Sequence, residues 1–202
     1  MTPREGIFAH WPNRITALRF AGSLILFLIF SLGGRLRLSE PGLVSQVAFW
    51  LFIVTALTDI LDGYLARRGN LVTAFGRIAD PFVDKVLVIG TMVFLASFEW
   101  TVRFVPAWIV VVVLAREFLV TGIRGYIESL GLPFPADWLG KVKMLIQCHA
   151  IGVVLGMSAW GVHVRFWDTV AHVLVWATLI TTLGSGMTYV LRMRRLVAEA
   201  AR

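Results

Sequence analysis

Apolar residues gather into long runs along the chain, and short polar stretches separate these runs. An α-helix of roughly 20 apolar residues crosses about 30 Å of hydrocarbon. The pattern predicts six membrane-spanning helices, built on the runs 18–32, 44–57, 83–98, 105–120, 144–160 and 170–191. Some runs are short because they continue into polar residues at one end, as expected of helices that enter a protein-lined pocket.

The composition agrees with an all-α integral membrane protein. Hydrophobic residues make up 58% of the 202-residue chain and charged residues 15%, whereas soluble domains average roughly 45–50% apolar and about 25% charged residues. We therefore expect one membrane domain over residues 1–202. Met1 to Thr16 mixes charges with Ile7, Phe8 and Trp11, which predicts a short N-terminal interfacial helix rather than a cleaved signal peptide.

The distribution of Lys and Arg predicts the orientation. With the N-terminus inside, only Arg35, Arg37, Arg103 and Arg165 of the 19 cations fall outside. Cytoplasmic flanks carry the excess of Lys and Arg, so both termini are expected in the cytoplasm. The net charge of +7 then reflects topology and attraction to anionic lipid headgroups, and we expect no nucleic-acid partner.

Four of the six aspartates fall close together, at Asp59, Asp62, Asp80 and Asp84. Their spacings of three and four residues place each pair on one face of a helix. The helix that carries Asp59 and Asp62 and the helix that carries Asp80 and Asp84 flank a predicted turn at 68–70. The two aspartate-bearing faces can therefore meet. Four carboxylates at close range repel one another unless cations bind between them.

The ligand types in the chain favour particular metal ions. The single Cys148 and four unclustered histidines offer no zinc site. Carboxylate oxygens alone suit Mg²⁺, Mn²⁺ or Ca²⁺. Small residues on the same faces, Gly63, Ala66 and Gly76, either allow tight helix packing or let a bulky ligand approach the backbone. Beside Arg67, we interpret them as part of a nucleotide or diphosphate site.

The segment 59–84 resembles the signature of the CDP-alcohol phosphotransferase family. That signature is Asp, two residues, Asp-Gly, two, Ala-Arg, eight, Gly, three, Asp, three, Asp. The matching positions are Asp59, Asp62, Gly63, Ala66, Arg67, Gly76, Asp80 and Asp84. The resemblance implies a CDP-linked donor and leaves the acceptor open.

Flanking residues resemble the bacterial branch of this family that transfers the phosphatidyl group of CDP-diacylglycerol to glycerol 3-phosphate. Gly125 departs from that branch, which usually has an acidic residue there. The matching residues are Pro12, Asn13, Thr16, Arg19, Arg116, Glu117, Arg124, Gly140, Lys141, Val142, Lys143 and Gln147.

The resemblance implies a role for each signature residue. Asp59, Asp62 and Asp80 would hold two Mg²⁺ or Mn²⁺ ions with help from Asp84, which would also be the general base. The CDP site would be lined by Asp62, Gly63, Ala66, Arg67 and Gly76. It also implies a homodimer in the cytoplasmic membrane of a bacterium, with the active site facing the cytosol.

An acceptor that carries its own phosphate needs fixed cations. Arg116, Arg124 and Lys141 lie on the cytoplasmic side, and Arg116 sits well inside an apolar run, where a cation is usually functional. Lys143, and Lys141 as well, can instead mark the membrane interface by snorkelling. We also expect Asn13, Thr16 and Arg19 to line the substrate pocket.

Other functions remain open from the sequence. Within the family the acceptor could be that of a phosphatidylinositol-phosphate, cardiolipin or phosphatidylserine synthase. A different class, an ion transporter or channel, is also compatible with charges in membrane helices. Transporter sites usually lie near the bilayer midplane in repeated, broken helices, whereas these carboxylates cluster at one end of the helices.

Overall fold

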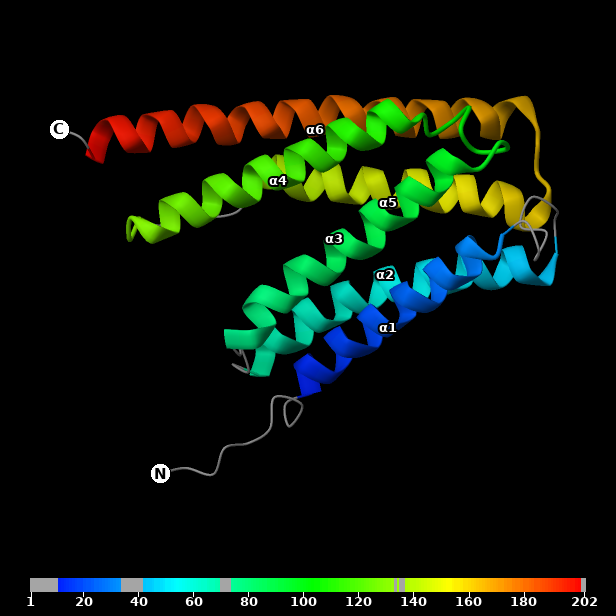
Figure 1. Ribbon diagram of the computed structural model, residues 1–202, viewed down its shortest axis with the longest axis horizontal. Helices are drawn as coiled ribbons and strands as arrows, with labels where there is room; N and C mark the ends of the chain where they lie inside the picture. The colour runs from blue at the N-terminus through cyan, green and yellow to red at the C-terminus, as the bar shows by residue number, and fades with distance from the viewer. Residues whose placement is uncertain (1–10, 34–41, 70–73, 133, 135–136, 201–202) are drawn as a thin grey trace. The chain divides into compact units, whose positions relative to one another are not determined.

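The computed structural model describes residues 11–33, 42–69, 74–132, 134 and 137–200, and their side chains except at 11–12, 59–69, 74–78 and 199–200. Within these ranges the chain forms six α-helices and no strand (Figure 1). The helices are α1 (Trp11–Ser31), α2 (Leu43–Gly69), α3 (Ala74–Ser97), α4 (Ala107–Ser129), α5 (Trp138–Trp160) and α6 (Arg165–Ala200). The predicted all-α fold with six helical segments is confirmed.

Several helices extend beyond the apolar runs that predicted them. α2 continues to Gly69 and α3 begins at Ala74, so the polar signature segment is mostly helical and its backbone hydrogen bonds are satisfied within the helices. The predicted turn at 68–70 coincides with the end of α2, and residues 70–73 lie outside the described part. The predicted interfacial helix also falls largely outside it, because the description begins at Trp11.

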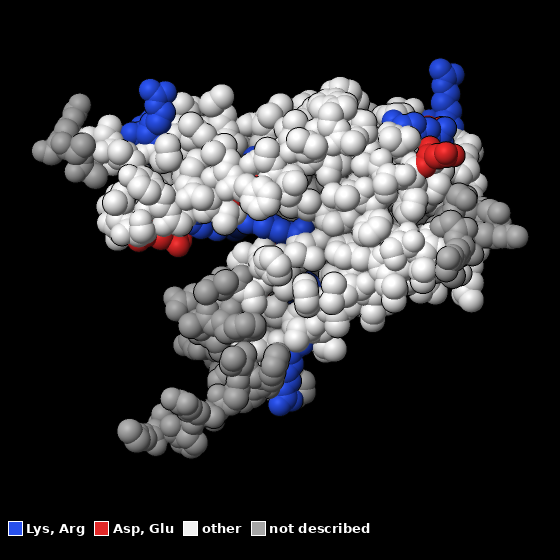
Figure 2. All heavy atoms as spheres, in the orientation of Figure 1, with Lys and Arg blue, Asp and Glu red and all other residues white. Residues whose placement is uncertain are grey.

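In the part of the chain that the structure describes, three helical segments are long and apolar enough to cross a membrane: Asn13–Ser31, Trp138–Trp160 and Arg165–Ala198. The apolar part of α2, Leu43–Thr58, is shorter. α3 and α4 carry charged residues within their length, which interrupts their apolar stretches. Among the residues that Figure 2 colours by type, few on the face drawn are charged.

One compact unit comprises Met1–Phe94 and Val154–His163. Within it α1 packs along α2, and Phe27 of α1 meets Phe94 of α3 with ring centroids 5.6 Å apart. A Cβ atom at Gly90 would lie 2.2 Å from the Phe27 ring. The absence of a side chain at position 90 therefore lets α3 approach α1 closely.

The second unit comprises Leu95–Val153 and Val164–Arg202. Here α4 packs along α6, and Trp108 and Trp176 meet edge to face at 5.8 Å. Tyr189 of α6 lies in an apolar cluster with Val120 and Ile127 of α4. This packing brings the polar residues of α4 against α6.

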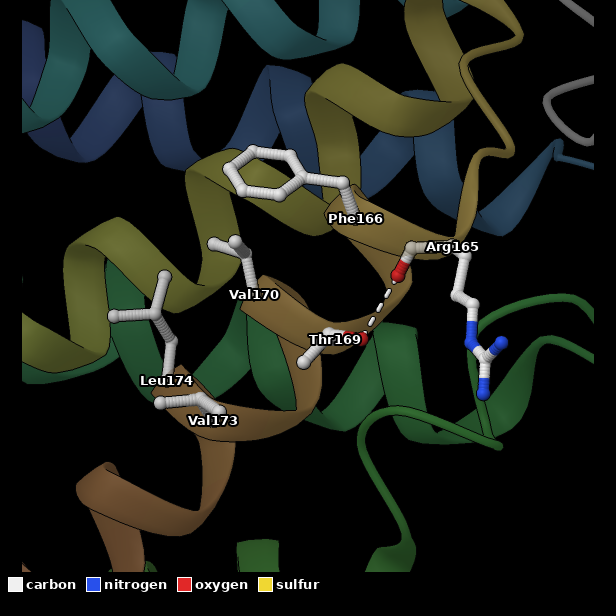
Figure 3. A pocket seen from close by; sticks show the side chains of 6 residues that line it. All are labelled: Arg165, Phe166, Thr169, Val170, Val173 and Leu174. Atoms are coloured by element: carbon white, nitrogen blue, oxygen red, sulfur yellow. Dashed lines mark hydrogen bonds between the residues drawn. The ribbon is translucent and has the colours of Figure 1, made fainter.

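The first turns of α6 border a groove of about 500 Å³. Most of its lining is apolar, and the Thr169 hydroxyl is turned inward to donate a hydrogen bond to the Arg165 carbonyl at 2.8 Å (Figure 3). No predicted site residue borders this groove, which is lined by Arg165, Phe166, Thr169, Val170, Val173 and Leu174.

Candidate active site

The signature residues occupy the end of α2 and the first half of α3. Asp59 and Asp62 lie in α2, whereas Asp80 and Asp84 lie in α3. The side chains of 59–69 and 74–78 are outside the described part. The predicted CDP-site positions Gly63, Ala66, Arg67 and Gly76 fall within these two ranges. Asp80 and Asp84 are one helical turn apart, so they share a face of α3.

α1 places a row of buried polar residues beside these two aspartates. Asn13, Thr16 and Arg19 recur every three residues and are 2–3% exposed. The Thr16 hydroxyl donates a hydrogen bond to Asp80 at 2.5 Å, and the Arg19 guanidinium donates one to Asp84 at 2.7 Å. Two of the residues that we expected in the substrate pocket therefore contact the carboxylates directly.

The Arg19–Asp84 ion pair fixes the orientation of Asp84. The Arg19 side chain is 1% exposed and that of Asp84 is 19% exposed, so the buried arginine holds a carboxylate that remains accessible. A charge-assisted hydrogen bond of this kind is both shorter and stronger than a neutral one. The carboxylate is thus held in a fixed orientation while part of it stays accessible to a ligand.

The second unit contains a separate group of buried charges. One oxygen of Glu117 accepts hydrogen bonds from Arg116, at 2.8 Å, and from Lys143. All three side chains are at most 11% exposed. Two cations on α4 and α5 therefore share one carboxylate, and the three groups together carry a positive charge.

Glu117→Gln is expected to lower the free energy of unfolding by about 3 kcal/mol, because it leaves two buried cations without their counter-charge. Denaturant titration in detergent micelles measures this. Glu128→Gln is the matched control, since Glu128 lies exposed on the same helix and should change stability little. Equal stability of Glu117→Gln and the parent chain would show that this carboxylate does not compensate the two cations.

Arg116 retains unused hydrogen-bonding capacity. Its Nε and Nη2 atoms are buried and have no hydrogen-bond partner in the described part of the chain. Two glycines leave room for it: a Cβ at Gly186 would lie 3.3 Å from its Cγ, and one at Gly140 would lie 3.8 Å from Nη2. Buried donors without partners are rare, and an anion that accepts from both would satisfy them.

Arg124 belongs to a second polar group in the same unit. Its Nη2 donates to the Tyr189 hydroxyl at 3.2 Å, and the Asp137 backbone N–H donates to the same oxygen at 3.0 Å. Thr188 in turn donates to the Asp137 carboxylate at 2.9 Å. These bonds tie the start of α5 to α4 and α6.

The structure separates the two lysines of α5. Lys141 is exposed, whereas Lys143 is 6% exposed and ion-paired with Glu117. Two residues correspond to about 200° around a helix, so the two side chains leave opposite sides of α5. The signal that could have found Lys143 is its four-residue spacing from Gln147, which is 2% exposed.

Residues that could hold a metal ion are described only in part. Among the described side chains no group of three or more His, Cys, Asp or Glu comes together, and the carboxylates of Asp59 and Asp62 lie outside that part. Asp80 and Asp84 on one face of α3 supply oxygen donors only. This donor set fits Mg²⁺ or Mn²⁺ and does not fit a zinc site.

Comparisons with known proteins agree with the signature. A family model described as CDP-alcohol phosphatidyltransferase matches residues 9–184. A CDP-diacylglycerol–glycerol-3-phosphate 3-phosphatidyltransferase of Bacillus subtilis (strain 168) is 36% identical over 184 residues, covering 88% of this chain and 92% of the relative. A probable phosphatidylglycerophosphate synthase of Mycobacterium tuberculosis (strain H37Rv) is 31% identical, covering 93% and 83%.

A third relative carries another activity in its name. The cardiolipin synthase (CMP-forming) of Streptomyces coelicolor is 34% identical over 196 residues, covering 92% of this chain and 83% of the relative. All three relatives span most of the chain, as does the family model. The chain belongs to the CDP-alcohol phosphatidyltransferase family.

Proposed function

We propose that this protein is a phosphatidylglycerophosphate synthase, which transfers the phosphatidyl group of CDP-diacylglycerol to glycerol 3-phosphate and releases CMP. Relatives with this activity in their names are 36% and 31% identical over most of the chain. The structural observation that carries the choice of acceptor is Arg116. It is a buried cation with two donors that find no partner among the described residues, which suits a phosphate-bearing alcohol.

The reaction is a substitution at phosphorus. The acceptor hydroxyl oxygen forms a bond to the lipid-linked β-phosphorus, the bond between this phosphorus and the bridging oxygen breaks, and CMP leaves with that oxygen. Asp84 takes the hydroxyl proton. Arg19 orients Asp84 for this role through their 2.7 Å ion pair.

The donor would be held by the signature residues. Gly63, Ala66, Arg67 and Gly76, together with Asp62, would line the CDP site. Asp59, Asp62, Asp80 and Asp84 would hold two Mg²⁺ or Mn²⁺ ions, which when bound neutralise negative charge on the diphosphate. Thr16 keeps Asp80 oriented through its hydroxyl.

The acceptor phosphate would be held by arginines. Arginine presents a planar fork of N–H groups that matches phosphate oxygens. Arg116 would donate through Nε and Nη2, and Arg124 would add a second guanidinium. Lys143 and Glu117 keep Arg116 in place, whereas the exposed Lys141 would guide the anion from solvent.

The membrane arrangement follows from the same proposal. All six helices would cross or enter the bilayer, with both termini and the active site on the cytoplasmic side of a bacterial inner membrane. Three of the helices have the required length and apolarity on their own. The enzyme would act as a homodimer among membrane lipids, as the family resemblance implies.

A direct assay of acceptors tests this function. The purified protein is incubated with CDP-diacylglycerol and, separately, with glycerol 3-phosphate, inositol phosphate, phosphatidylglycerol or serine. We expect CMP release with glycerol 3-phosphate to exceed that with any other acceptor by at least about tenfold, as the names of the relatives suggest. The buried donors of Arg116 favour the phosphate-bearing acceptors over serine. Faster release with phosphatidylglycerol would instead assign the activity of the Streptomyces relative.

A further inference from the structure

We propose that Tyr189 is a positioning residue that aligns Arg116 and Arg124 on the acceptor phosphate; this inference rests on the function proposed above. Tyr189 lies in α6, beyond residue 184, where the family match ends. Its side chain is buried, with 3% exposure. Neither the signature nor the flanking matches include it.

Tyr189 contacts both arginines at once. Its ring centroid lies 5.5 Å from the Arg116 guanidinium carbon, within the range of a cation–π interaction. Its hydroxyl accepts a hydrogen bond from Arg124 Nη2 at 3.2 Å. One side chain therefore uses its face for one guanidinium and its oxygen for the other.

α4 alone does not bring these guanidiniums together. Arg116 and Arg124 are eight residues apart, which corresponds to about 12 Å along the helix axis and about 80° around it. An element from elsewhere in the chain contacts both side chains. Tyr189 supplies that contact from α6, which packs along α4.

The surroundings of Tyr189 keep it in this position. Gly186, one turn earlier, leaves space for the Arg116 side chain to pass along α6. The Asp137 N–H donates to the Tyr189 hydroxyl at 3.0 Å, which anchors that oxygen to the start of α5. The ring packs in the cluster formed with Val120, Ile123, Ile127 and Phe134.

A role in packing alone does not account for the hydroxyl. A phenylalanine would fill the same apolar cluster without burying a polar group, and burying one is unfavourable unless it is hydrogen-bonded. Here the hydroxyl accepts from a guanidinium whose buried Nε has no hydrogen-bond partner within the described ranges. The oxygen thus holds one side of Arg124 while another donor stays available for an anion.

The test compares Tyr189→Phe with Tyr126→Phe. Tyr126 is 52% exposed on α4, so the control removes a hydroxyl that positions nothing. We expect Tyr189→Phe to raise the KM for glycerol 3-phosphate about tenfold, as loss of a hydrogen bond to a charged group implies. The kcat and the KM for CDP-diacylglycerol should stay within about twofold of the parent values, and Tyr126→Phe should match the parent throughout.

A double-mutant cycle with Arg124→Gln separates positioning from packing. If the hydroxyl acts through Arg124, adding Tyr189→Phe to Arg124→Gln should not raise the KM further. Additive effects, an unchanged KM in Tyr189→Phe, or a lower kcat with a lower unfolding midpoint and the same KM would each overturn the proposal.

The parent protein is assayed first, so that a wrong acceptor and a wrong role for Tyr189 give different results. Absence of CMP release with glycerol 3-phosphate rejects the proposed function. The double-mutant cycle is then measured with the phosphate-bearing acceptor that gives the fastest CMP release by the parent protein. The KM shift for that acceptor still decides the role of Tyr189.

Discussion

Asp84→Asn is expected to lower the rate of phosphatidyl transfer by about 10³-fold or more. A positioned general base contributes about 10²–10⁴-fold, and an amide neither accepts the proton nor binds a cation as a carboxylate does. The fold should survive, because the amide oxygen can still accept the hydrogen bond from Arg19. CMP release by the purified variant, with its unfolding midpoint, measures both expectations.

Asp168→Asn is the matched control for this change. Asp168 pairs with Arg103 at 3.6 Å, so the control also converts an arginine-paired aspartate to an amide, but at a position with no proposed role in the reaction. Full activity is expected. Rapid CMP release by folded Asp84→Asn would show that another group removes the hydroxyl proton.

Removal of divalent cations is expected to reduce CMP release to below about 1% of its starting rate, because the ions supply several kcal/mol of charge stabilisation in reactions of this type. The four signature carboxylates would then also repel one another and the diphosphate. Addition of Mg²⁺ or Mn²⁺ should restore the rate, whereas Zn²⁺ should not, because the proposed ligands are oxygen atoms only.

The control for chelation uses EDTA that has been saturated with Mg²⁺ beforehand. It exposes the protein to the same chelator without removing ions, so the rate should not change. A metal-free preparation that retains its full rate would eliminate the cations from the proposed chemistry and leave the carboxylates with roles in binding alone.

The sequence predicted the helices better than the contacts between them. Apolar runs located each of the six helices that the structure describes, because an apolar stretch of that length has few alternatives to a helix in a membrane. The runs ended too early where helices carry charges, as in α2, which continues to Gly69. Periodicity also placed Asp80 and Asp84 correctly on one face of α3.

Apolar runs and helical periodicity did not predict contacts between residues that are far apart in the sequence. Nothing in the spacing of Thr16 and Arg19 indicated that they would bind Asp80 and Asp84, more than 60 residues away. Such pairs depend on which helix faces meet and at what depth. The same holds for Tyr189, whose two arginine contacts arise only when α6 packs along α4.

α2 is a single helix of 27 residues, about 40 Å long at 1.5 Å per residue. Only Leu43–Thr58 is apolar, so in the proposed orientation the remainder rises out of the hydrocarbon towards the cytosol. The donor lipid can reach the signature segment only by lateral diffusion within the bilayer, whereas glycerol 3-phosphate reaches it by diffusion through the aqueous cytosol. The relevant concentration of the donor is therefore its mole fraction in the bilayer, and dilution with inert lipid should slow the enzyme even at constant total substrate.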